Sequence, residues 1–214
     1  MKSCILLVII SFLIFPAKIN AQEHEKKNTY LPVWTYHKSN SNIFGLALGF
    51  GTVRTLSRNT NSHGVKVELI GLGFLSPLTP HSPVARDLNE FVELNNEPLS
   101  EKIYGLNFSL TGTLCDCKTV GLSIGGVGQY NFQINGLSLT PLMNFAQVHN
   151  GIQIAIFNDS YQMRGFQIGA RNNSFNSGGV QIGLFNYSKN LKGFQIGLWN
   201  VNQKRGSPIL NWAL

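Results

Sequence analysis

The sequence has few charged residues and few cysteines. Asp, Glu, Lys and Arg make up 13% of the 214 residues, and there are 3 cysteines. The Lys and Arg residues form no run interleaved with aromatic residues, so we expect no nucleic-acid partner. Cys4 lies in the N-terminal leader, and the remaining pair, Cys115 and Cys117, is too small for a structural zinc site. The composition therefore predicts no metal site and no cofactor.

The N-terminal apolar run is too short to cross a membrane as a helix. It covers 11 residues, 5–15, whereas a transmembrane helix needs about 20. Lys2 precedes the run, Pro16 ends it and Ala21 supplies a small residue, which is the layout of a secretory signal peptide. We expect residues 1–21 to be cleaved and the mature chain to be exported to the periplasm, the outer membrane or the cell surface. Cys4 precedes the run, so no lipid-attachment cysteine is expected.

Glycine and asparagine are abundant, and they recur in a repeat. Four copies of the pattern Gly-x-Gln-Ile-x-x-x-Asn start 14 residues apart, at residues 151–158, 165–172, 179–186 and 193–200. Looser copies start at Gly136, Gly121 and Gly105, and more distant ones at Gly45 and Gly64. Apolar residues alternate with polar ones inside each unit, which indicates short β-strands. The sequence predicts an all-β array in one domain, residues 43–214, after a lead-in segment at 22–42, with the strict repeats at 151–200.

The alternation assigns two faces to each predicted strand. We expect the apolar face, for example Phe194, Ile196 and Leu198, to point inward and form the core. The asparagines that end each unit would form a hydrogen-bonded structural ladder: Asn158, Asn172, Asn186 and Asn200. The outward face would carry glutamines, with aromatic residues at its edge. It is either a candidate binding face or a second ladder of glutamines that only stabilises the stack. The glutamines are Gln153, Gln167, Gln181 and Gln195, and the aromatic residues are Phe157, Phe185 and Trp199.

Two architectures fit a repeat of strands and turns. One is a solenoid-like stack of parallel coils, and the other is an antiparallel up-and-down meander, as in an outer-membrane β-barrel. A membrane barrel has an apolar band about 25 Å tall, whereas three alternate residues cover only about 13–16 Å at ~3.3 Å per residue. The connections between the strict repeats also have equal lengths, so the sequence favours the stack.

One segment breaks the strand pattern. Residues Val84, Leu88, Phe91 and Val92 follow Pro83 at helical spacing, with acidic residues on the opposite side. Proline suits the first turn of a helix. We therefore expect one amphipathic helix at about 83–95, inserted into the β-array and packed against it.

The repeat itself resembles a known family. The phrase Gly-aliphatic-Gln-Ile-Gly-Leu-aromatic-Asn at 14-residue spacing is similar to the surface repeat family named after a Leptospira surface-exposed lipoprotein, with many members in Bacteroidetes. Residues 64–73 and 208–212 resemble that family too. The resemblance covers most of the mature chain and implies an exported envelope protein with an all-β repeat. It implies no catalytic residue, and this chain differs from the lipoprotein members because it lacks a lipid-attachment cysteine.

Candidate chemical groups are few. Residues 121–125 match the Gly-x-Ser-x-Gly motif of serine hydrolases, but no helical pattern follows Ser123, which occupies the glutamine slot of the repeat. The histidines lie in polar segments, without the spacing of a metal pair, and are expected to be solvated: His24, His37, His63, His81 and His149. Cys115 and Cys117 need a local bend to form a disulfide, because alternate residues of a strand lie about 6.5 Å apart.

The predicted function is therefore that of a non-enzymatic, exported surface or envelope protein with a structural or adhesive role. Its partner would be an unidentified envelope or extracellular ligand, and membrane association stays open. A small outer-membrane β-barrel with a pore or scaffold role is the alternative. A serine hydrolase that uses Ser123 is a remote one.

Overall fold

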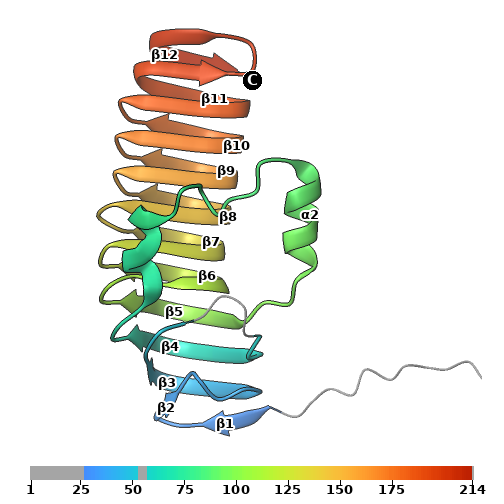
Figure 1. The fold of residues 1–214 in the computed structure, drawn as a ribbon, viewed down its shortest axis with the longest axis vertical. Coiled ribbons are helices and arrows are strands. Elements are labelled where there is room, and N and C mark those ends of the chain that lie inside the picture. The colour runs from blue at the N-terminus through green and yellow to red at the C-terminus, as the bar shows by residue number, and fades with distance from the viewer. Residues whose placement is uncertain (1–26, 53–56, 214) are drawn as a thin grey trace, which may run out of the picture.

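The chain winds into a β-solenoid (Figure 1). The computed structural model describes residues 27–52 and 57–213, so the predicted signal peptide lies outside the described residues. The long strands follow one another up the stack: β3 (Ser41–Gly49), β4 (Thr60–Glu68), β5 (Glu101–Ser109), β6 (Leu114–Gly125), β7 (Gly128–Leu139), β8 (Met143–Ile154), β9 (Phe157–Ile168), β10 (Arg171–Ile182) and β11 (Phe185–Asn202). Each pairs in parallel with the next, which confirms the stack rather than the antiparallel meander.

A column of glycines marks one corner of the coils from β3 to β11. These glycines pair in register along the whole stack, and all have positive φ: Gly45, Gly64, Gly105, Gly121, Gly136, Gly151, Gly165, Gly179 and Gly193. At Gly179 φ is 151°, and a Cβ there would collide with the carbonyl oxygen of Gly165. Only glycine fits such a position. We call the strand residues before the corner glycine the first arm and the three residues after it the second arm.

Both ends of the stack are covered by short strands. Residues expected to form a lead-in segment include β1 (Asn28–Tyr30) and β2 (Val33–Thr35), which both pair in parallel with β3. At the other end β12 (Gly206–Ala213) folds back antiparallel on β11. The strands within residues 28–35 thus belong to the solenoid and close its first coil.

The insertion contains two helical segments, and its α-helix begins later than the sequence predicted. The segments are a 3-10 helix, η1 (Leu72–Leu78), and α2 (Leu88–Asn96). The side chain of Asp87 accepts a hydrogen bond from the Glu90 amide at 2.9 Å, and this cap, not Pro83, sets the first turn. Val84 therefore lies in a bend before the helix, where it is buried.

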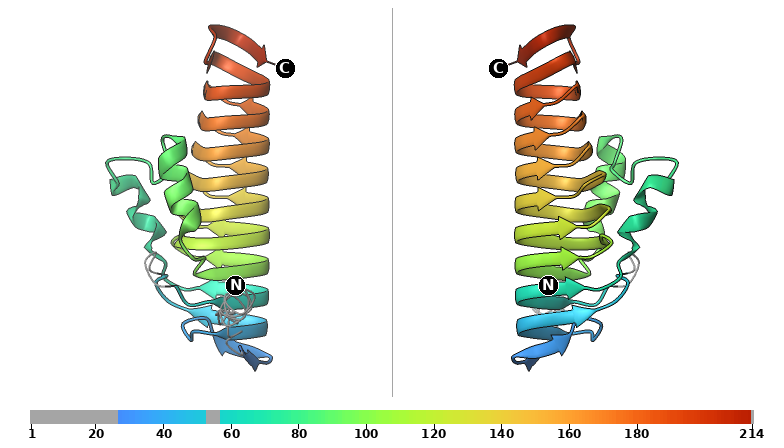
Figure 2. Two further views of the ribbon diagram at one scale, coloured as in Figure 1. Left: turned by 90° about the vertical axis from the view of Figure 1, so that its right-hand side faces the viewer. Right: turned by 90° about the vertical axis from the view of Figure 1, so that its left-hand side faces the viewer.

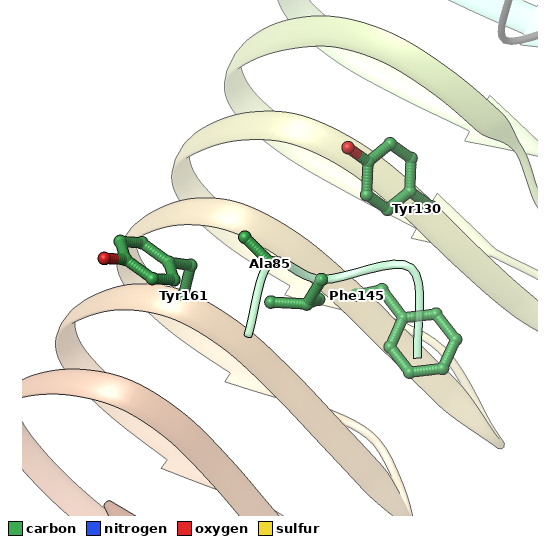
Figure 3. Close-up of a cluster of buried hydrophobic side chains, with 5 residues drawn as sticks. Ala85, Tyr130, Phe145 and Tyr161 are labelled. Carbon is green, nitrogen blue, oxygen red and sulfur yellow. The ribbon is translucent and has the colours of Figure 1, made fainter. Parts of the chain in front are cut away.

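The insertion covers the outer surface of the first arms (Figure 2). Phe91 of α2 stacks on Tyr161 of β9 with ring centroids 4.2 Å apart, whereas Leu88 and Val92, which the helical spacing placed on the packed face, are exposed. Ala85 lies in the same buried cluster as Tyr161, together with Val84, Tyr130 and Phe145 (Figure 3). The main apolar cluster of the described residues thus lies between the insertion and the stack, outside the coils.

Candidate functional site

From β4 onward the second arms turn polar side chains into the coils, which reverses the predicted faces. The repeated glutamines on the second arms are fully buried: Gln153, Gln167, Gln181 and Gln195. Gln167, Gln181 and Gln195 each donate from Nε2 to Oε1 of the glutamine one coil earlier, at 2.9 Å for Gln167 to Gln153 and 2.7 Å for Gln181 to Gln167. Gln167 also reaches across the coil to the hydroxyl of Ser160 on the first arm, at 2.9 Å. The prediction of an exposed glutamine face was therefore wrong.

The physical reason lies in the exact register of the stack. A buried amide is costly only when it lacks partners. Parallel stacking of identical units places a glutamine above and below Gln167 and Gln181, so the donor and the acceptor of each amide are both satisfied, as in other stacked amide ladders. The hydrophobic effect alone favours apolar residues inside, but the mutual hydrogen bonds of the stacked amides remove the cost of burying the glutamines instead.

The asparagine ladder is confirmed. Asn158 donates to Asn172 at 2.9 Å, Asn172 to Asn186 at 2.8 Å and Asn186 to Asn200 at 2.7 Å. The same Nδ2 groups also donate to the last carbonyl of a second arm, as Asn172 does to Ile182 at 2.8 Å. The asparagines therefore close the turn between successive coils as well as linking them.

The second arms present an uncovered apolar surface. Two columns of side chains point outward, one residue and three residues after each corner glycine; the first runs Leu46, Val65, Leu106, Leu122, Leu137, Ile152, Phe166, Val180 and Phe194. The second runs Leu48, Val67, Phe108, Ile124, Leu139, Ile154, Ile168, Ile182 and Ile196. We call these two columns the apolar face. Ile182, expected in the core, is 38% exposed.

The apolar face runs without interruption along the stack. Nine coils about 4.8 Å apart give a length near 38 Å, and three residues of strand give a width near 10 Å, so the flat area is on the order of 400 Å². This area is comparable to the largest apolar patch of a typical monomer, about 300–600 Å², and such patches are often functional. The predicted aromatic edge is exposed as expected, with Phe157, Phe185 and Trp199 beside the turns that follow the second arms. The apolar face and this edge are the candidate functional surface.

The C-terminal coils are basic. After Asp159 the sequence contains no Asp or Glu but has Arg164, Arg171, Lys189, Lys192, Lys204 and Arg205. Arg164 and Lys192 lie two residues before Phe166 and Phe194, across the corner glycine, so they border the apolar face. The surface therefore combines exposed apolar side chains with cations at its edge.

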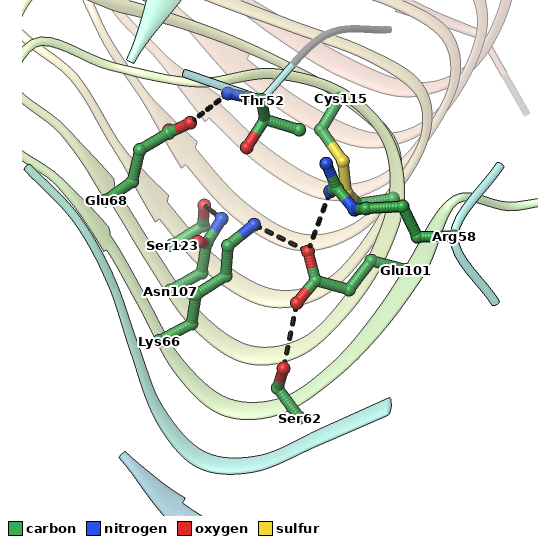
Figure 4. Close-up of a disulfide and its surroundings, with 10 residues drawn as sticks. Thr52, Arg58, Ser62, Lys66, Glu68, Glu101, Asn107, Cys115 and Ser123 are labelled. Atoms are coloured by element: carbon green, nitrogen blue, oxygen red, sulfur yellow. Dashed lines mark hydrogen bonds and ion pairs between the residues drawn. A yellow bond between two sulfur atoms is a disulfide. The ribbon is translucent and has the colours of Figure 1, made fainter. Parts of the chain in front are cut away.

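The first coils enclose a cluster of buried charges (Figure 4). Glu101 Oε2 lies 2.7 Å from Lys66 Nζ and 3.3 Å from Arg58 Nη2, and its Oε1 accepts from Ser62 at 2.8 Å. Burial alone would raise the pKa of the nearby Glu68 carboxyl, but Lys66 and hydrogen bonds lower that pKa below its ordinary value. Lys66 occupies the glutamine column, where sequence reasoning missed it because its copy of the repeat is so divergent.

A disulfide lies beside this cluster. Cys115 and Cys117 are joined, and an irregularity in the pairing of β6 brings their Cα atoms to 5.1 Å. Both side chains are buried next to Glu101, close enough for the three groups to hold a metal ion. Joined sulfurs offer no thiolate ligand, so this trio in its oxidised form is a poor metal site.

The remaining candidate groups are enclosed. Ser123 is buried, donates to Gln129 Oε1 at 2.9 Å and accepts from Asn107 at 3.2 Å, and strand β7 follows it instead of the helix that the hydrolase motif requires. His149 was expected to be solvated but is fully buried, and burial lowers its pKa to about 4. It occupies the interior column of Ile134 and Met163.

A cleft of about 540 Å³ separates the insertion from the first arms of the C-terminal coils. Asp159 and Arg171 line it, with His81 and Arg86 of the insertion. Burial raises the pKa of Asp159, opposed by hydrogen bonds from Ser82 and Asn173. The hydrogen bond from Ser82, a residue of the insertion, joins the Asp159 carboxylate of β9 to the insertion, so this carboxylate helps to hold the insertion on the coils.

Comparisons with protein-family models, curated proteins and solved structures find no match. Within residues 27–52 and 57–213, none of the helices has the length and apolar character needed to cross a bilayer.

Proposed function

We propose that this protein is an exported, non-catalytic protein of the bacterial envelope that attaches to an anionic lipid surface through its apolar face. The observation that carries the proposal is the apolar face itself, which the insertion leaves open because it packs on the opposite arms. The N-terminal leader and the resemblance to a surface repeat family support export to the envelope.

The composition of the surface favours lipid as the partner. Proteins bind a membrane interface by inserting apolar side chains and by attracting anionic headgroups with Lys and Arg. Phe166 and Phe194 supply the first feature and are 44% and 45% exposed, and Arg164 and Lys192 at the edge supply the second. Trp199 at the turn edge suits the headgroup region, where tryptophan is enriched.

The cations also favour a negative surface over an apolar protein face. Each Lys or Arg close to an anionic membrane contributes about 1 kcal/mol of attraction. The C-terminal coils carry no acidic residue after Asp159 to oppose it. A second copy of the chain would present the same positive charge, so self-association through this end of the face would be repulsive.

Vesicle flotation of the mature chain tests the proposal. We expect it to float with phosphatidylcholine vesicles that contain phosphatidylglycerol, and to float less with phosphatidylcholine alone or at high salt. A buried phenylalanine contributes roughly 1.5–3 kcal/mol, so the double variant Phe166→Ser, Phe194→Ser should bind at least about tenfold more weakly. Leu88→Ser, which removes an exposed apolar side chain from α2, is the matched control and should bind like the wild type.

Two results would contradict the proposal. One is the absence of flotation with either vesicle. The other is a stable dimer in size-exclusion chromatography that the double phenylalanine variant dissociates while lipid binding is absent, which would make the apolar face a contact between copies of the chain.

A further inference from the structure

The corner of the last coils forms a groove of about 480 Å³. The residues just before the corner glycines of β9, β10 and β11 line it, and residues 202–204, after the last coil, close one end. Gly178 leaves a gap in the column between Arg164 and Lys192. A Cβ at Gly178 would meet the Met163 carbonyl oxygen at 3.6 Å and Arg164 Cγ at 3.7 Å, which are ordinary van der Waals distances, so the position accepts a side chain without a clash.

The groove is positively charged. Arg164, Lys189, Lys192 and Lys204 line it, all four are exposed, and the lining residues include no Asp or Glu. Arg164 and Lys192 lie two coils apart, which is about 10 Å at ~4.8 Å per coil. Among residues 27–52 and 57–213, the ion pairs within 4.0 Å are those of Glu101 in the first coils, so none of the described carboxylates pairs with a groove cation.

Neutral amides lie beside these cations. Asn176, Asn190 and Gln203 line the same groove, and Asn190 donates to Asn176 at 2.8 Å. Several cations around a gap the size of a missing side chain suit a compact anion of high charge. A guanidinium binds phosphate oxygens in pairs, and lysine binds them as a point charge. Amides add hydrogen bonds without adding repulsion.

We propose that this groove binds a phosphate monoester or pyrophosphate group. The source of this phosphate group rests on the proposed lipid attachment. Because the groove borders the apolar face, it would receive a phosphorylated lipid headgroup while that face lies on the membrane. A free phosphate compound has the same chemistry and is the other source that the experiment distinguishes.

Binding of inorganic pyrophosphate to the mature chain, measured by isothermal titration calorimetry, tests the site without lipid. Gly178→Glu places a carboxylate between the cations and should weaken binding at least about tenfold, since a like charge opposes the ligand. Gly178→Ala adds only a methyl group at ordinary van der Waals distances from its neighbours and should change affinity less than about twofold. Lys192→Gln should weaken binding about three- to tenfold. Lys102→Gln, which removes an exposed cation four coils away in the column of Gln162 and Asn176, should leave it unchanged.

Vesicles that carry phosphatidic acid or phosphatidylglycerol at equal surface charge identify the source. A headgroup site predicts tighter binding to phosphatidic acid, a phosphate monoester, and loss of this preference in Gly178→Glu but not in Gly178→Ala. Pyrophosphate binding with the expected variant pattern but no vesicle binding would assign the groove to a free phosphate compound and defeat the proposed lipid function alone. Two results would overturn the groove assignment while lipid attachment stands. One is equal affinity of Gly178→Glu and Gly178→Ala for pyrophosphate. The other is vesicle binding without pyrophosphate binding and without a preference for phosphatidic acid.

Discussion

Replacing one buried glutamine of the ladder should destabilise the protein more than replacing the exposed isoleucine next to it. Gln181 donates to Gln167 at 2.7 Å, to Ser174 at 3.1 Å and to the Tyr187 carbonyl at 3.2 Å, and it accepts from Gln195 at 2.7 Å. The change Gln181→Leu keeps the side-chain size but removes all of these bonds.

The size of the effect follows from which partners stay unpaired. Gln195 Nε2 keeps the Val201 carbonyl at 3.1 Å, but Gln167 Oε1 loses its donor inside the coil. A buried polar atom without a partner costs about 1–3 kcal/mol. Gln195 Nε2 also loses one of its two acceptors. Together these losses should lower the free energy of unfolding of Gln181→Leu by about 2–4 kcal/mol. Ile182→Thr keeps the β-branched shape on a half-exposed position and should cost about 1 kcal/mol or less.

Urea unfolding of the mature chain, followed by far-ultraviolet circular dichroism, measures both effects. Gln203→Leu, at an exposed glutamine outside the ladder, is the control for the chemical change itself and should leave the midpoint near that of the wild type. A larger loss of stability in Ile182→Thr than in Gln181→Leu would refute the reasoning, because it would mean that the apolar side chains form the interior.

Two further predictions concern the interior and the corner of the coils. The pKa of His149 is about 4 in the folded protein and ordinarily about 6.5, so the unfolded state binds more protons below pH 6.5 and stability is lost as the pH falls from 6.5 through 4. His149→Met should remove about 3 kcal/mol of this loss. The measurement is the difference between the free energies of urea unfolding at pH 7 and pH 4, and an equal difference in the wild type and the variant would contradict the prediction. Gly179→Ala should cost at least about 2 kcal/mol, since its Cβ collides with backbone at positive φ, whereas its neighbour Gly178→Ala should be close to neutral in thermal unfolding; equal melting temperatures would show that the corner tolerates a side chain.

The periodicity of the chain was enough to predict the stack. Four copies 14 residues apart with alternating polarity require strands of one length and equal connections, and parallel in-register pairing is the arrangement that places identical residues above one another. The asparagine ladder follows from that register alone, because each Asn158-type residue meets its own copy. The corner glycines are visible for the same reason, since a backbone at positive φ admits no other residue at the same place in every coil.

Which face turns inward depended on the tertiary structure. The three residues centred on Gln167 show the same alternation of polar and apolar side chains whether the glutamine points into the coil or out of it. The pattern therefore does not indicate which face is inside. The hydrophobic effect favours the apolar residues inside, but the stacked amides satisfy one another and remove the cost of burying them. The same holds for Lys66, Glu101 and His149, whose burial arises from their position in the register and leaves no local pattern. The sequence alone thus determined the coil and its repeat, whereas the polar interior, the open apolar face and the basic groove were decided by the way successive coils stack and by where the insertion packs.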